Sequence, residues 1–171
     1  MAMTGYSSGL WESFFVANAG AAAALAGLVF VGVSINIERI APSPRLSGRA
    51  LEAFVLLAEV LVVAVLGLVP AIGRTGLGVA LGIVGAVVWL VVTRAAVASL
   101  PSRSGEAAQG PAGSSVTRVL LGQLATVPLI VAGFTLLVGS GGGLFWLVPA
   151  IVFAYVTALG DAWVLLVEIL R

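Results

Sequence analysis

The sequence predicts an all-α integral membrane protein, a bundle of about five transmembrane helices that forms a single domain over residues 1–171. Of the 171 residues, 61% are hydrophobic and only 9% are charged. A soluble domain is roughly 45–50% apolar and roughly 25% charged. The chain also contains five apolar stretches of the roughly 18–25 residues that cross a ~30 Å hydrocarbon layer as a helix. These observations exclude a soluble globular domain and a disordered chain.

The expected spans follow one another along the whole chain. Helices are favoured over a β-barrel because the stretches are continuously apolar, without the alternation of a barrel strand. Lipid also requires that backbone polar groups be satisfied within each segment. The spans are expected near residues 12–37, 51–72, 76–100, 118–139 and 144–170.

Proline and glycine mark the breaks between these spans. Two prolines in residues 41–44 are expected to end the first helix, because proline lacks an amide donor and restricts the residue before it. Pro70 and residues 73–76 indicate a tight turn, and the glycine-rich residues 139–143 indicate a flexible one. Residues 101–117 are expected to form one long flexible loop.

The arginines are distributed unequally between the two ends of the expected bundle. Cytoplasmic loops carry an excess of Arg and Lys, so the end with seven of the eight basic residues is expected to face the cytoplasm. The N-terminus then lies outside and the C-terminus lies in the cytoplasm, as an odd number of spans requires. The cytoplasmic arginines are Arg39, Arg45, Arg49, Arg94, Arg103, Arg118 and Arg171, and Arg74 lies on the other side.

The composition also limits the chemistry of the chain. It has no Cys and no His, which excludes disulfide scaffolds, cysteine nucleophiles, histidine bases and Cys/His zinc sites. A net charge of +1 excludes a nucleic-acid binder driven by phosphate contacts. Since no nucleophile and base are arranged for catalysis, we expect a protein that is not an enzyme. We expect no catalytic residue, no metal site, no cofactor and no nucleic-acid partner.

Two carboxylates inside the spans are the main chemical signal. Glu59 lies eight residues into the second span, and Asp161 lies nine residues from the cytoplasmic end of the fifth. Both are therefore expected at one level, roughly 12–13 Å deep in the cytoplasmic half of the membrane. A charge at mid-membrane costs on the order of 2.5–3.5 kcal/mol and usually faces the bundle interior or a wet cavity. Other polar residues expected in this layer are Gln123, Ser34, Asn36, Arg94 and Arg118.

This polar layer has two interpretations. It forms an ion or proton path, with Glu59 as the first candidate and Asp161 as the second. Alternatively, Glu59 or Asp161 pairs with Arg94, and the neutralised pair only fixes how the helices pack.

Small residues recur at helical spacing in two of the spans. Gly20, Ala24 and Gly27 lie in the first span, and Gly78 and Gly82 lie in the third. In lipid, small residues let helix backbones approach closely. They indicate either an oligomer interface or pore-lining helix, or packing within one protomer.

Both ends of the chain resemble a known family. The first helix, WESFFVANAGAAAALAGLVFVGVSIN from Trp11 to Asn36, and the ending, DAWVLLVEILR from Asp161 to Arg171, carry the resemblance. They resemble a family of small actinobacterial polytopic membrane proteins that are often labelled "modulator of FtsH protease"; the middle of the chain is similar only by hydropathy. The resemblance implies a multi-pass protein of the bacterial cytoplasmic (inner) membrane. The family often has Asn at the position of Asp161, which implies that Asp161 need not be ionised.

Two functional hypotheses follow. The first, which we favour, is a homo-oligomeric ion channel or pore in the lipid bilayer, based on the small-residue helices, the carboxylates and the missing catalytic apparatus. The alternative is a non-conducting adaptor or modulator of another membrane protein, such as the FtsH protease. Exchange of Glu59 to Gln should alter transport in a channel and only stability in an adaptor.

Overall fold

The computed structural model describes residues 4–6, 8–98 and 112–169, and every regular element within these ranges is helical. Five helices are long and apolar enough to cross a membrane. The prediction of an all-α membrane bundle with five spans is therefore confirmed. The elements are η1 (Thr4–Tyr6), η2 (Ser8–Trp11), α1 (Glu12–Ile35), α2 (Ile37–Ile40), α3 (Pro44–Leu68), α4 (Gly73–Ala98), α5 (Ala112–Val138), η3 (Gly143–Trp146) and α6 (Leu147–Ile169).

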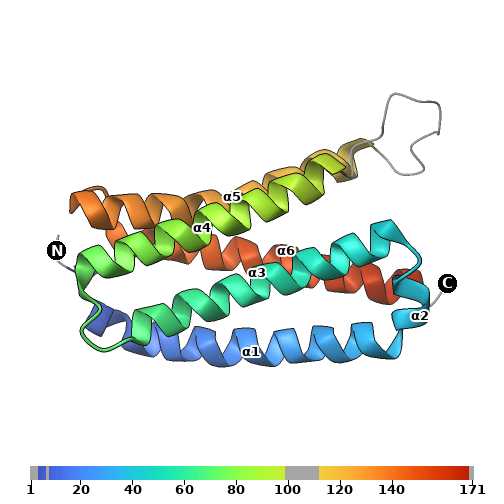
Figure 1. Cartoon of the computed structure of the whole chain (residues 1–171), viewed down its shortest axis with the longest axis horizontal. Helices are drawn as coiled ribbons and strands as arrows, with labels where there is room; N and C mark the ends of the chain where they lie inside the picture. The colour runs from blue at the N-terminus through green and yellow to red at the C-terminus, as the bar shows by residue number, and fades with distance from the viewer. Residues whose placement is uncertain (1–3, 7, 99–111, 170–171) are drawn as a thin grey trace.

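The five long helices form three layers (Figure 1). α1 lies along one edge of the bundle, α3 and α6 form the middle, and α4 and α5 form the opposite edge. α4 packs most extensively against α5, α1 packs against α3, and α6 packs against both α3 and α5. The chain begins at one end of the bundle, and α2 lies at the other. We refer to these as the N-terminal end and the α2 end.

The second span begins earlier than the sequence predicted. α3 begins at Pro44 and ends at Leu68, whereas the expected span covered residues 51–72. The Ser43 hydroxyl accepts a hydrogen bond from the amide of Leu46 at 3.4 Å, which caps the helix start. Proline at the first helical position does not weaken the helix, because an amide N–H at that position would have no carbonyl partner within the helix. Pro44, one of the two prolines expected to end the first helix, therefore starts α3, and Pro42 lies in the turn before it. α1 already ends at Ile35.

The expected loop over residues 101–117 is shorter than predicted, because α5 begins at Ala112. Hydropathy identifies only the part of a helix that lies in the hydrocarbon layer. The backbone hydrogen bonds of the helix continue beyond that apolar part. The remainder of that loop, with Arg103, lies outside the described residues, as does Arg171.

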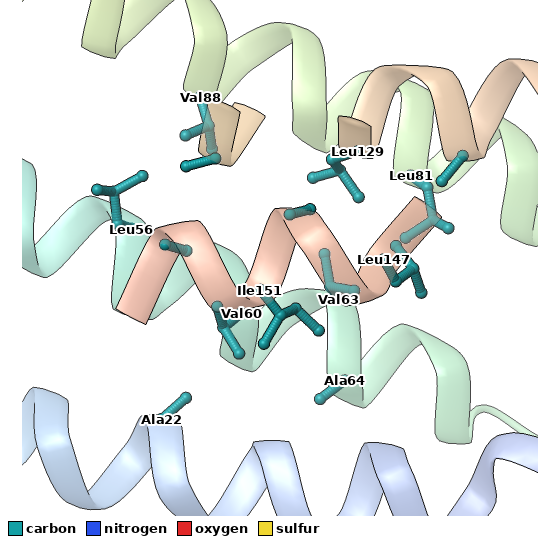
Figure 2. Close-up of a cluster of buried hydrophobic side chains, with 14 of the residues drawn as sticks. Ala22, Leu56, Val60, Val63, Ala64, Leu81, Val88, Leu129, Leu147 and Ile151 are labelled. Carbon is teal, nitrogen blue, oxygen red and sulfur yellow. The ribbon is translucent and has the colours of Figure 1, made fainter. Parts of the chain in front are cut away.

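An apolar core fills the space between the middle layer and the α4–α5 edge (Figure 2). Leu56, Val60 and Val63 of α3 belong to the same buried cluster as Leu129 of α5 and Ile151 of α6, and none of the five is more than 5% exposed. The helices are thus held by close contacts of branched side chains, the interaction that remains available when lipid is as apolar as the core.

Candidate functional site

Two buried ion pairs connect the helices at the α2 end. Nη1 of Arg49 on α3 donates a hydrogen bond to Oδ1 of Asp161 on α6 at 2.9 Å. Nε of Arg118 on α5 donates to Oε2 of Glu52 on α3 at 2.7 Å, and Nη2 of Arg118 contacts the same oxygen. Glu52 and Asp161 are 5% and 4% exposed. The two pairs therefore tie α3 to α6 and to α5.

The two pairs form one network, because Asp161 also interacts electrostatically with Glu52 and Arg118. Its four charges sum to zero, and their mutual attraction offsets part of the several kcal/mol that it costs to take each ion out of water. Nε of Arg49 and Oδ2 of Asp161 are buried without a hydrogen-bond partner among the described residues. Asp161 is thus in an ion pair, as one interpretation of the polar layer proposed, but its partner is Arg49. The expected partner, Arg94, is an exposed residue of α4. The prediction chose the wrong arginine because it placed Arg49 in a loop, two residues before the second span was expected to begin, whereas α3 begins at Pro44.

Glu59 lies apart from this network. It is the sixteenth residue of α3, roughly 22 Å from the helix start at 1.5 Å per residue. Arg49, which pairs with Asp161, lies ten residues earlier on the same helix, or roughly 15 Å away along its axis. The expectation that Glu59 and Asp161 share one level is therefore wrong, again because α3 begins at Pro44.

The remaining polar residues of the expected layer serve separate local contacts. Gln123 on α5 accepts a hydrogen bond from Nε1 of Trp89 at 2.7 Å and donates one to the Thr93 hydroxyl at 3.1 Å, so it joins α5 to α4. Asn36 donates to the carbonyl four residues before it at 2.9 Å. Ser34 is exposed. Of the seven polar residues expected in this layer, the structure thus brings only Asp161 and Arg118 into one network.

The glycines of the third span contact a neighbouring helix of the same subunit. A Cβ atom added to Gly133 on α5 would lie 2.7 Å from the amide nitrogen of Gly82 and 2.9 Å from the carbonyl oxygen of Gly78 on α4. No side chain fits between backbones at such a separation. Gly78 and the backbone of Gly82 therefore serve packing against Gly133 within one protomer, although a Cβ atom added to Gly82 itself would meet no atom within 4 Å.

The glycines of α1 have no such neighbour. A Cβ atom added to Gly20 or Gly27 would meet no atom within 4 Å. They belong to a row of exposed residues spaced alternately four and three apart, which runs nearly the length of α1. This row, termed the α1 strip, consists of Ser13, Ala17, Gly20, Ala24, Gly27, Val31 and Ser34.

A groove of about 370 Å³ separates α1 from α6 towards the α2 end, and its lining includes Leu28 and Gly32 of α1 and Trp163 of α6. Nearer the N-terminal end the two helices meet, because the Tyr155 hydroxyl donates a hydrogen bond to Oδ1 of Asn18 at 3.2 Å. α1 is thus held by α3 along its length and by α6 through this polar contact.

Sequence reasoning missed Glu52 as a member of the buried polar network. Arg49, Glu52 and Glu59 are spaced by three and seven residues, which places all three on one face of a helix. That pattern would have revealed the network once the helix was known to begin before residue 49. Within the described residues, no three acidic side chains gather in a way that could hold a metal ion.

Comparisons of the chain with family models, with curated proteins and with solved structures give no match. The functional argument therefore rests on the geometry of the bundle, and membership of the family labelled as FtsH modulators stays a prediction.

Proposed function

We propose that this multi-pass membrane protein is a homo-oligomeric pore of the bacterial cytoplasmic membrane, with α1 of each subunit facing the pore. The observation that carries the proposal is the α1 strip. It is a row of small residues on a membrane helix that no other part of the described subunit covers.

The spacing of the α1 strip suits contact between helices. Steps of four and three residues repeat every 3.5 residues on average, the period that keeps one face of a helix against a partner in a left-handed pair. Small side chains along such a face let two backbones approach closely in lipid. Copies of α1 from neighbouring subunits are therefore suitable partners for one another.

The interior of a single subunit is poorly suited to an ion path. Branched apolar side chains fill the described core around Glu59. A pore between subunits would instead be narrowed by the apolar α1 strip, and apolar constrictions close pores by excluding water. The exposed residues Glu12 and Glu38 lie just at the two ends of α1, where rings of carboxylates would favour cations.

A second candidate function is the non-conducting adaptor. The observation that favours it is the absence of any charged residue between Glu12 and Glu38, so the α1 strip has no group that would hold an ion in transit. The same strip would then bind a helix of another membrane protein, for which the family resemblance suggests the FtsH protease.

Assembly along α1 is tested with single cysteines, which have no background because the chain contains no Cys. Gly27→Cys, in the α1 strip, is expected to form disulfide-linked dimers in the membrane. Val87→Cys, on an exposed part of α4, is the matched control and is expected to stay monomeric. Failure of Gly27→Cys to crosslink above this control would contradict assembly along the α1 strip.

Conduction is tested by ion flux from sealed liposomes that contain the purified protein. Flux above empty liposomes that changes in Gly27→Leu, and not in Glu59→Gln, would support a pore between subunits. Flux that changes only in Glu59→Gln would place the path inside the subunit. Crosslinking without flux over a range of pH, voltage and cations would contradict the pore and favour the adaptor.

A further inference from the structure

Glu59 is a buried carboxyl group without a partner. Its side chain lies in the apolar middle of the bundle, and the residue is 4% exposed. Among the residues that the structure describes, nothing forms a hydrogen bond with either of its carboxyl oxygens. Glu52 and Asp161, the other two acidic residues buried in the bundle, both have an arginine partner. Glu59 therefore differs in kind from the residues that fix helix packing.

One small void adjoins Glu59, and no other polar side chain lines it. The void has a volume of about 10 Å³, close to the smallest that holds a single water molecule. Besides Glu59, it is lined by Val60 and Val63 of α3, Leu129 of α5, and Leu147, Ala150, Ile151 and Ala154 of α6. Three helices thus close around the carboxyl group with hydrocarbon alone.

Charged groups on the helices around Glu59 lie far along the bundle. On its own helix, Glu52 is seven residues away and paired with Arg118 of α5. On α6, Asp161 lies seven residues beyond Ala154 and is paired with Arg49 of α3. Two helical turns separate each acid from the void, roughly 10 Å. The remaining described charges on α3, α4 and the neighbouring α1 are Arg45, Arg74, Arg94 and Glu12, all close to helix ends.

A carboxylate in such a place has no means of stabilisation. An unpaired ion in an apolar interior is so costly that the group takes up a proton instead. A neutral carboxyl group needs only one or two hydrogen bonds, which a single water molecule in the void can provide. The geometry therefore suits a proton as the ligand of this site and excludes a hydrated metal cation by size.

We infer that Glu59 is a proton-binding site. It is a neutral carboxylic acid while α3, α5 and α6 are packed around it, and it releases its proton only when these helices separate enough to admit water. The site links proton release to an opening of the bundle core. This inference does not rest on the proposed pore, because the void lies inside one subunit and is remote from the α1 strip.

Infrared spectroscopy of the protein in lipid bilayers tests the protonation state directly. At neutral pH the wild type should show the carbonyl stretching band of a protonated carboxylic acid. The band should disappear in Glu59→Gln, which keeps the side-chain size, and persist in Glu38→Gln, which changes an exposed carboxylate on α2. Absence of the band from the wild type, or its persistence in Glu59→Gln, would overturn the inference.

The pH dependence of folding gives an independent readout. The unfolded chain releases the Glu59 proton above about pH 4.3, whereas the folded chain keeps it. The folding equilibrium constant should therefore fall as the pH rises, by up to about tenfold per pH unit, because the unfolded state binds fewer protons. Glu59→Gln should lack this part of the slope. Equal slopes in the wild type and Glu59→Gln would contradict proton binding at this site, whatever the outcome of the flux experiment.

Discussion

α1 and α3 are helices of nearly equal length that pack against each other, yet they differ in how deeply they are buried and in where their charged residues lie. Inside the subunit, 50% of the most apolar part of α3 is buried, against 11% for α1. α3 carries the ion-paired residues Arg49 and Glu52 and the buried carboxyl group of Glu59. The described charges nearest to α1 lie only at its two ends, at Glu12 and Glu38.

This difference teaches that hydropathy alone does not say which helix forms the interior of a membrane bundle. Buried polar groups identify α3 as interior, because charges in lipid must face protein partners. An exposed row of small residues identifies α1 as peripheral and available for contact. Four substitutions test this distinction, in order of decreasing expected effect on the subunit.

Removing a charged side chain from α3 should cause the largest loss of stability. Arg49→Leu leaves Asp161 buried and unpaired, which should lower the free energy of unfolding by about 3 kcal/mol. Unfolding in mixed detergent micelles, followed by circular dichroism, measures the loss. The double variant Arg49→Leu with Asp161→Leu should regain most of it. If the double variant is as unstable as Arg49→Leu alone, the pair is not what holds α3 to α6.

Enlarging the contact between α1 and α3 should have the next largest effect. In Gly67→Ala the new methyl group would lie 2.5 Å from ring carbons of Phe15, which is fully buried. Overpacking of this kind costs about 2 kcal/mol, measured by the same unfolding assay. Gly48→Ala on the same helix has open space around it and should cause no loss. Equal stability of the two variants would show that α1 is not firmly docked on α3.

Removing the polar contact between α1 and α6 should have a small effect. Asn18→Ala takes away the side-chain acceptor of the Tyr155 hydroxyl and leaves the Asn18 carbonyl, 3.3 Å away, as its second acceptor. Interhelical hydrogen bonds of this kind contribute about 0.6 kcal/mol. The same unfolding assay should detect this decrease at the edge of its precision. Tyr155→Phe removes the donor of both hydrogen bonds and should cause at least as large a decrease. The double variant should lose no more stability than Tyr155→Phe alone. Additive losses would mean that the two side chains act separately.

A large side chain in the α1 strip should have the smallest effect on the subunit. Gly27→Leu points into open space, so the free energy of unfolding of the monomer should change by less than about 0.5 kcal/mol. The distribution of oligomers in the membrane should nevertheless shift towards the monomer, as sedimentation in detergent would show. A clear loss of monomer stability would mean that this face of α1 is covered within the subunit.

The sequence was sufficient to predict the class of the fold. Apolar stretches of membrane length and glycine-rich breaks predicted five membrane helices, because lipid leaves few alternatives to helices. It was not sufficient to predict the start of α3, where Ser43 and Pro44 begin the helix well before the apolar residues. Only three-dimensional contacts revealed that the charged residues near such a boundary belong to the helix.

The candidate site was predicted in part. Asp161 and Glu59 stood out because acidic residues within membrane spans are rare. Their partners could not be read from the sequence, since a shift of seven residues in α3 decides whether Arg49 faces solvent or Asp161. The two sets of glycines also look alike in the sequence, although Gly78 and Gly82 meet Gly133 while Gly20 and Gly27 meet nothing. The regular spacing of small residues shows that a helix can pack closely against a neighbour, but it does not show which helix that neighbour is.

The Arg49–Asp161 pair also has a consequence for biogenesis. The two residues are 112 positions apart in the chain, and α6, which carries Asp161, leaves the ribosome after the other four long helices. At 5–20 residues per second, Arg49 waits roughly 6–22 s for its partner. Once Arg118 has paired with Glu52, the nascent protein holds an uncompensated positive charge inside the membrane until Asp161 arrives. A chain that is truncated before α6 keeps this charge permanently, so a quality-control factor that detects intramembrane charge can distinguish it from a chain that contains α6.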